Sequence, residues 1–421
     1  MTARLRVMAL CLLSLSLSAC STISPLPARA PSHSAATATT TVATSPASRP
    51  APADKVTETP SLSSVAAAPP PVSVAACAQA VLRSLPRAQL AAQVFNVGLD
   101  VTDLGSGRDL VTQTGVGGVF LSGRSQSGLG LAPAIAGLQR SALAAGRLPL
   151  LVSADEEGGV VQSVRGPGIP LWPSAFEQST WTLSELSSRS AGWASSLRTL
   201  GITLNLGPVA DVVSIADRAF NPPIGALGRE YGANAVAAAT RVSIVTASLQ
   251  HAGVGATAKH FPGLGRVRAN TDTSNKAQDD VATADDVNLA PFRAAIRSGA
   301  SAVMVSSARY PQLDSTDPAV WSTRIITTLL RGNLGFSGLV ISDDLANAQA
   351  VRAVPVGDRA IRFLRAGGDL VLIVDRADLL PMLTAVQGEA AASPAFSARL
   401  QQAAQHVVES KIHLGLVPCS H

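Results

Sequence analysis

Charged side chains are scarce in this sequence. Asp, Glu, Lys and Arg make up 14% of the 421 residues, and the formal net charge is +5. The basic residues are scattered, and no Lys/Arg run offers the dense positive stripe that a nucleic-acid groove needs. We therefore expect no nucleic-acid partner, while a hydrophobic content of 47% allows a large core.

The sequence also lacks the short motifs of several enzyme classes. It contains no HExxH or CxxC for a metal, no P-loop, no GxGxxG dinucleotide fingerprint and no GxSxG nucleophile elbow. Most of its six histidines lie toward the chain ends (His33, His406, His413 and His421). We expect neither a metal nor another cofactor.

Cysteine is rare as well, and the first two of four cysteines belong to a predicted export segment, residues 1–19 with Cys20 behind them. This segment has a basic start and an apolar core too short to span a membrane as a helix. The tetrad Leu17-Ser18-Ala19-Cys20 resembles a bacterial lipobox, which implies cleavage before Cys20 and lipidation of its thiol. Plain secretion is the alternative. The lipobox predicts a protein anchored by lipid to the extracytoplasmic face of the cell membrane.

Cys77 and Cys419 are the remaining cysteines, and they stand near the two ends of the predicted folded domain. In an oxidising compartment such a pair is expected to form a disulfide. Between the lipidated cysteine and this domain, residues 20–76 are rich in Ser, Thr, Ala and Pro and have no aromatic residue. They predict a disordered tether, because they offer too little apolar surface to fold.

From residue 77 to 421 the chain alternates apolar runs with helix-like segments, as in a parallel sheet covered by helices. A (β/α)8 TIM barrel as the single catalytic domain fits this pattern, and a doubly wound open sheet is weakened by the missing dinucleotide fingerprint. The predicted strands are the eight runs 94–99, 117–121, 148–155, 202–208, 255–260, 300–307, 338–344 and 369–375. We expect the protein to be a monomer.

Polar residues follow these strands where they end, and in a barrel the carboxyl ends of the strands converge on one face. They are Asp155, Asn205, Lys259 with His260, Ser306 with Ser307, and Asp343 with Asp344. Each has an ordinary structural interpretation when taken alone, such as a helix cap or a paired core residue. Five polar strand ends on one rim predict an active site.

Three of these strand ends offer distinct chemistry. Asp155, in DEEGG, can accept hydrogen bonds from sugar hydroxyls. Lys259 and His260 can donate to hydroxyl or acyl oxygens, but consecutive strand residues share a pocket only if the chain bends there. Asp343 can act as a nucleophile on an anomeric carbon, while Asp344 is expected to fix the following loop.

Residues 78–417 resemble glycoside hydrolase family 3, in particular its single-domain β-N-acetylhexosaminidases. DEEGG (155–159), KHFPG (259–263) and GFSGLVISDDL (335–345) carry the resemblance in this order. The resemblance implies a β-N-acetylglucosaminidase that uses Asp343 as its nucleophile.

Substrate binding is implied for Asp155, Lys259 and His260, and for an arginine that Arg229 matches best in IGALGREYG. A second family arginine is missing, since Ser163 stands at its position. Arg165 is a weak substitute.

The acid/base is where the sequence departs from the family. Relatives end the loop after KHFPG with an Asp-Ser-His triplet whose histidine is the acid/base. We assign Asp272-Thr273-Ser274 to this triplet, after a loop about two residues longer. A serine hydroxyl is too weak an acid to protonate a leaving oxygen near neutral pH.

Three explanations stay open. Asp272 itself is the acid, kept protonated by burial. Glu156 or Glu157 is recruited instead. Or catalysis is impaired and the protein is a cell-wall sugar-binding lipoprotein. A further alternative is another β-glycosidase, although those relatives usually carry a second α/β domain. The expected substrate is an N-acetylglucosaminide derived from the cell wall.

Overall fold

The structure is a computed structural model that describes residues 73–419. The predicted signal peptide, Cys20 and nearly all of the tether lie outside the described residues. Within residues 73–419, no helix combines the length and the apolar character that a membrane crossing requires.

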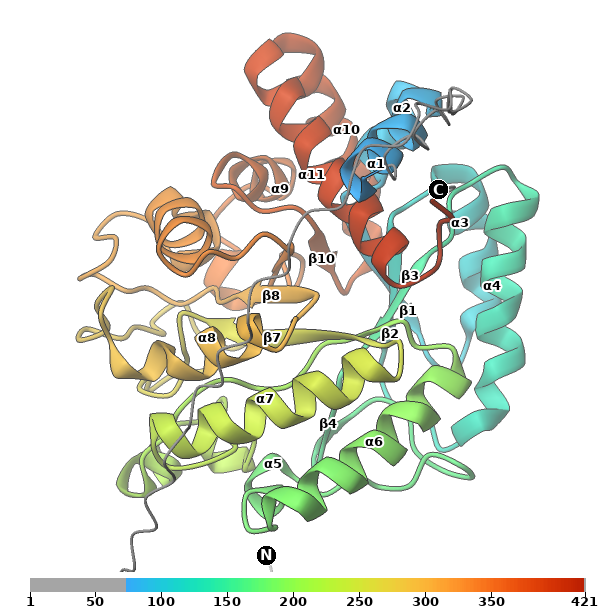
Figure 1. Cartoon of the computed structure of the whole chain (residues 1–421). Coiled ribbons are helices and arrows are strands. Elements are labelled where there is room, and N and C mark those ends of the chain that lie inside the picture. Colours follow the sequence, from blue (N-terminus) through green and yellow to red (C-terminus); the bar gives the residue numbers. More distant parts are fainter. Residues whose placement is uncertain (1–72, 420–421) are drawn as a thin grey trace, which may run out of the picture. The chain divides into compact units, whose positions relative to one another are not determined.

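Eight parallel strands form the centre of the structure, as predicted (Figure 1). They are hydrogen-bonded in the order β10-β1-β2-β3-β6-β7-β8-β9, and a parallel bridge between Ile341 and Leu370 joins the two edge strands. The sheet therefore closes into a (β/α)8 barrel and is not a doubly wound open sheet. The strands are β1 (Phe95–Asp100), β2 (Gly118–Ser122), β3 (Leu151–Ala154), β6 (Leu204–Asn205), β7 (Gly255–Phe261), β8 (Ala302–Val305), β9 (Leu339–Ser342) and β10 (Val371–Ile373).

Helices follow the strands and cover the outside of the barrel; α6 and α7 lie side by side there (Figure 1). The α-helices are α1 (Val74–Ser84), α2 (Arg87–Ala92), α3 (Arg108–Thr114), α4 (Ala132–Ala144), α5 (Ala175–Gln178), α6 (Leu183–Leu200), α7 (Ala235–His251), α8 (Ala290–Arg297), α9 (Val356–Arg365), α10 (Leu379–Ala392) and α11 (Pro394–His413). A π-helical segment, η7 (Arg324–Asn333), occupies the helix position between β8 and β9.

Short elements shape the loops beyond the strands. After β3, the antiparallel hairpin of β4 (Glu156–Gly158) and β5 (Val161–Gln162) interrupts the alternation. The 3-10 turns are η1 (Leu104–Gly107), η2 (Gly128–Leu131), η3 (Ile215–Phe220), η4 (Gly225–Leu227), η5 (Val287–Leu289), η6 (Ala319–Trp321), η8 (Gln349–Val351) and η9 (Arg376–Asp378).

The core has two parts. Most buried apolar side chains lie between the strands and the helices. A second cluster includes Phe120, Leu206, Met304 and Leu372 from alternate strands of the barrel. These four also line the cavity described below, so the apolar interior of the barrel becomes the floor of the site.

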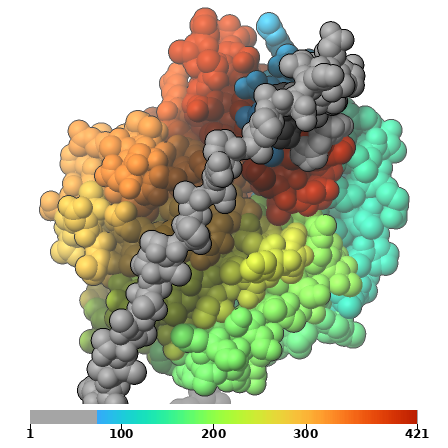
Figure 2. All heavy atoms as spheres, in the orientation of Figure 1, coloured from blue at the N-terminus to red at the C-terminus, as the bar shows by residue number. Residues whose placement is uncertain are grey.

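The two ends of the described chain meet. Cys77 in α1 and Cys419 form a disulfide with Cα atoms 5.7 Å apart. Figure 2 shows the C-terminal residues in red beside the blue N-terminal helices. The predicted domain start at residue 77 lies within helix α1. Helix α1 begins at Val74 because the Ser73 hydroxyl accepts a hydrogen bond from the Ala76 amide and caps it.

Candidate active site

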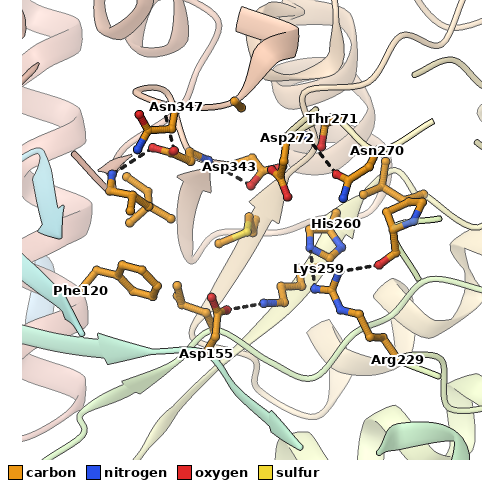
Figure 3. A pocket seen from close by; sticks show the side chains of 18 residues that line it. Phe120, Asp155, Arg229, Lys259, His260, Asn270, Thr271, Asp272, Asp343 and Asn347 are labelled. Carbon is orange, nitrogen blue, oxygen red and sulfur yellow. Dashed lines mark hydrogen bonds and ion pairs between the residues drawn. The ribbon is translucent and has the colours of Figure 1, made fainter. Parts of the chain in front are cut away.

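A cavity of about 300 Å³ opens where the barrel strands end (Figure 3). Six of its lining residues are the site residues that the sequence predicted: Asp155, Arg229, Lys259, His260, Asp272 and Asp343. They come from separate loops and strand ends, and the barrel brings them together as expected.

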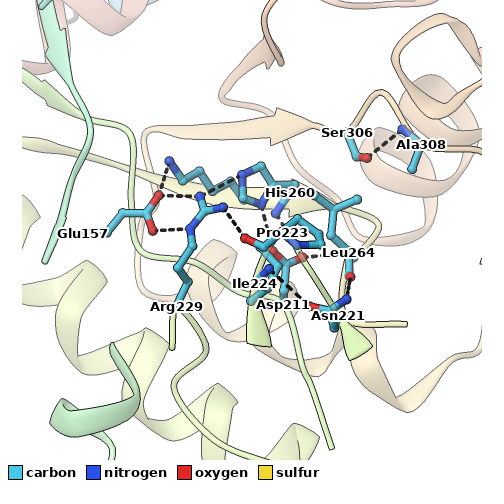
Figure 4. A network of polar contacts seen from close by, with 12 residues as sticks. Glu157, Asp211, Asn221, Pro223, Ile224, Arg229, His260, Leu264, Ser306 and Ala308 are labelled. Atoms are coloured by element: carbon cyan, nitrogen blue, oxygen red, sulfur yellow. Dashed lines mark hydrogen bonds and ion pairs between the residues drawn. The ribbon is translucent and has the colours of Figure 1, made fainter. Parts of the chain in front are cut away.

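One wall of the cavity is a network of paired charges. The Lys259 ammonium donates to Asp155 and lies 2.6 Å from one oxygen of each of Asp155 and Glu157. Glu157 also accepts two hydrogen bonds from the Arg229 guanidinium, at 2.7 and 2.8 Å (Figure 4). Burial acts to raise the pKa of Glu157, but Arg229 and Lys259 outweigh it and lower the pKa to about 2.

Lys259 stays positively charged in this network although it is almost fully buried. Burial acts to lower the pKa of Lys259, but the Asp155 and Glu157 carboxylates raise it above its ordinary value. With both cations fixed by carboxylates, their remaining N–H groups are available to a polar ligand in the cavity.

His260 is oriented by a buried aspartate that the sequence reasoning missed. Asp211 accepts a hydrogen bond from His260 Nδ1 at 2.8 Å, and its other oxygen accepts from the amides of His260 and Leu264. A carboxylate can only accept, so Nδ1 carries the proton and Nε2 lies toward Arg229, at 3.4 Å from Nη2. Asp211 is the sole charged residue in the apolar run 202–213. A charge in such a run is expected to be buried and to need a partner, and this was the signal that could have identified Asp211.

Lys259 and His260 both line the cavity although they are consecutive in β7. The pairing register between β7 and β8 shifts between Ala258 and Phe261. An irregularity of this kind lets a strand re-aim a side chain. The bend that the sequence placed at Phe261-Pro262-Gly263 is thus already present within the strand.

Asp343 lies directly after β9 and faces the cavity (Figure 3). Burial raises the pKa of Asp343 to about 6; His260 opposes this shift, and the Asp272 carboxylate adds to it. Asp344 accepts hydrogen bonds from the amides of Ala346, Asn347 and Val374, which confirms its predicted role in fixing the loop.

The loop after KHFPG contributes three consecutive residues to the cavity, Asn270, Thr271 and Asp272. Ser274, the residue assigned to the histidine position, does not line the cavity, and its hydroxyl oxygen accepts a hydrogen bond from the Lys276 amide.

Asp272 is held by its backbone. Its amide donates to the Asn270 side chain at 3.0 Å, and its carbonyl accepts from the Gln349 amide at 3.1 Å. The residue is exposed, so the burial expected to keep this carboxyl protonated is absent.

The other residues considered for the acid role do not fit it. Glu157 is tied to two cations and is fully ionised at neutral pH. Glu156 is completely buried and does not line the cavity. Arg165, the weak substitute for the missing arginine, does not line it either, and Ser163 is buried. Among the described residues no cluster of three His, Cys, Asp or Glu side chains suits a metal ion.

Comparison with known proteins finds a matching family model and similar relatives. Residues 89–410 match the model of the glycosyl hydrolase family 3 N-terminal domain. A β-hexosaminidase of Xanthomonas campestris pv. campestris is 34% identical over 294 residues, which are 67% of this chain and 84% of that protein.

Two solved structures are also similar. A β-N-acetylhexosaminidase from Beutenbergia cavernae is 41% identical, with a TM-score of 0.75, and the match covers 78% of this chain and 99% of that one. A family 3 glycosyl hydrolase from Mycobacterium smegmatis is 28% identical, with a TM-score of 0.67, covering 77% and 98%.

Proposed function

The chain belongs to glycosyl hydrolase family 3, and on this premise we propose that it is an exported β-N-acetylglucosaminidase that retains the anomeric configuration. It is a glycoside hydrolase of the β-hexosaminidase type. The observation that supports the finer proposal is the pair of carboxyls at the cavity, Asp343 and Asp272, opposite a wall of sugar-binding donors.

In the proposed reaction the ionised Asp343 attacks the anomeric carbon and forms a glycosyl-enzyme ester. Asp272 gives its proton to the departing glycosidic oxygen. Asp272, now ionised, then takes a proton from water, which attacks the same carbon and releases both the sugar and Asp343. Each carboxyl ends in the protonation state in which it began.

Asp155, Lys259, His260 and Arg229 are the proposed substrate-binding residues. Asp155 is partly exposed and can accept from sugar hydroxyls, while Lys259 and Arg229 can donate to hydroxyl or acetamido oxygens. Their mutual ion pairs hold them in place before substrate arrives, which reduces the entropy lost on binding.

The proposed substrates are N-acetylglucosaminides released from the cell wall, and the proposed location is the extracytoplasmic face of the cell membrane. The lipobox and tether of the sequence support the location, and the named activities of the relatives support the sugar. We propose that the protein acts as a monomer.

The nucleophile can be tested with Asp343→Asn and a slow mechanism-based substrate. Wild type incubated with a 5-fluoro N-acetylglucosaminyl fluoride should accumulate a covalent sugar on the peptide that contains Asp343. The Asn variant should lose turnover of an aryl N-acetylglucosaminide by about 10³-fold or more. A label on another residue, or an equally active variant, would refute the assignment.

The acid/base is tested with Asp272→Asn and two leaving groups. An aryl leaving group needs little protonation, so its cleavage should suffer less than that of a disaccharide. The basic limb of the pH–rate profile should also disappear in the variant. Equal losses for both substrates would show that Asp272 does not supply the proton.

A further inference from the structure

Glu156 lies between Asp155 and Glu157, the two carboxylates that hold Lys259. Its side chain is fully buried and stays outside the cavity. It thus has no direct access to substrate, yet it belongs to the segment that carries one wall of the site.

The contacts of Glu156 join this segment to its surroundings. Its amide donates to the Asn205 side chain, and its carbonyl accepts from the same side chain, both at 3.0 Å. Its Oε1 accepts from the Val164 amide at 2.7 Å, beyond the end of β5. Glu156 therefore links the β4–β5 hairpin to strand β6 and closes the hairpin itself.

The second carboxyl oxygen, Oε2, has no hydrogen-bond partner among the described residues. The nearby Gln162 amide is already committed, because it donates to the carbonyls of Val164 and Pro170. A buried anionic oxygen without a donor is far less stable than a neutral hydroxyl in the same place.

The electrostatic surroundings favour the neutral acid as well. Burial raises the pKa of Glu156 to about 8; the Val164 amide opposes this shift, and the Asp155 carboxylate adds to it. Asp155 is the charged group that faces Glu156 on its own segment. The groups that face it from β5 and β6 are neutral: the Gln162 side chain, the Ser163 and Val164 amides and the Asn205 side chain.

We infer that Glu156 is a positioning residue that works as an un-ionised carboxylic acid, and that loss of its proton loosens the hairpin carrying Asp155 and Glu157. An ionised Oε2 would draw the side chain toward water and break the bond to Val164. Lys259 and Arg229 would then lose the fixed positions of their carboxylate partners. This inference rests on the proposed role of these residues in sugar binding.

The direct test compares the KM of wild type with that of Glu156→Gln between about pH 7 and about pH 9.5, with an aryl N-acetylglucosaminide. Glutamine has the shape of the neutral acid and cannot ionise. The wild-type KM should rise about tenfold over this range, while that of the Gln variant should change by less than about twofold. Glu185→Gln, at a half-buried surface glutamate of α6 that pairs with Arg189, is the matched control and should keep the wild-type rise.

Thermal unfolding gives a second readout that needs no turnover. A glutamate with a raised folded-state pKa binds its proton more tightly in the folded protein. Wild type should therefore lose stability relative to Glu156→Gln as pH rises from about 4.5 to about 8, with no further change above. The melting temperature of the Gln variant should exceed that of wild type by several degrees near pH 8.

The two readouts separate this inference from the proposed function. If neither protein turns over substrate but the stability difference grows with pH as described, the neutral acid stands and the proposed activity fails. If the KM rise persists in Glu156→Gln, another group causes it and the inference is overturned. If the Gln variant cannot fold, an ionised Glu156 is required, which also overturns the inference.

Discussion

Two buried lysines lie at opposite ends of the barrel and have opposite surroundings. Lys259, at the carboxyl end of β7, meets two carboxylates, and its pKa is raised. Lys411, in α11, donates to the Gln93 side chain just before β1, and burial lowers its pKa to about 7. The first is a charged group beside a cavity, whereas the second is mostly an amine packed in the core.

The histidines repeat this contrast. His260 and His406 each have Nδ1 within 2.9 Å of a buried aspartate, Asp211 and Asp369 respectively. Asp369 also binds Arg331, Arg399 and the Val340 amide, so both of its oxygens are used within the protein. Similar pairs thus lie at both ends of the barrel, and what differs is that His260 lines the cavity whereas His406 does not.

The strongest test of this contrast is Asp369→Asn. The change leaves two arginines without a buried counter-charge, so the free energy of unfolding should fall by about 3–5 kcal/mol. The remaining folded enzyme should keep its KM, because Asp369 is remote from the cavity. Urea unfolding measures the free energy of unfolding, and steady-state kinetics on the same sample measure KM. A rise in KM with unchanged stability would contradict the assignment.

Lys411→Met should stabilise the protein in a pH-dependent way. Wild-type Lys411 has a folded pKa of about 7 against 10.5 when unfolded, so wild-type stability rises with pH between these values. The free energy of unfolding of the Met variant should exceed that of wild type most below pH 7. This difference should shrink by on the order of 3 kcal/mol toward pH 10. The lost contact with Gln93 is independent of pH. A constant difference between the two proteins would show that Lys411 is charged in the fold.

Asp211→Asn should mainly affect catalysis. An amide can donate to His260 Nδ1, which favours the wrong tautomer and misorients the ring in the cavity. We expect kcat/KM to fall by about 10–100-fold, with a smaller effect on stability than Asp369→Asn. Steady-state kinetics and urea unfolding of Asp211→Asn and Asp369→Asn, measured side by side, test this prediction. Equal losses of stability would remove the distinction between the two ends.

The smallest expected effect is the acidic limb of the pH–rate profile. The proposed nucleophile Asp343 must be ionised to attack, and burial raises its pKa to about 6. The rate should therefore rise about tenfold per pH unit below pH 6 and level off above it. An acidic limb that levels off near pH 4 instead of pH 6 would mean that Asp343 is more solvated than the structure indicates.

The eight apolar runs predicted all eight barrel strands, because parallel strands buried on both faces leave a continuous apolar pattern. The strand ends likewise predicted Asp155, Lys259, His260 and Asp343 as neighbours. The role of Asp211 was missed, since its partner His260 is 49 residues away in the chain. The cavity-lining position of Asn270 and Thr271 was also missed, because a short polar loop has no periodicity that predicts which side chains face inward.

The sequence by itself determined the barrel, the family and the strand ends that carry the site, since these depend on local pattern and on short motifs. Only the tertiary structure decided which carboxyls face the cavity, which buried lysine meets two carboxylates and which histidine lines the cavity. These properties depend on burial and on partners far away in the chain. The residues next to a lysine, aspartate or histidine in the sequence carry no information about these partners. For this physical reason the sequence could not distinguish the two lysines or the two histidines.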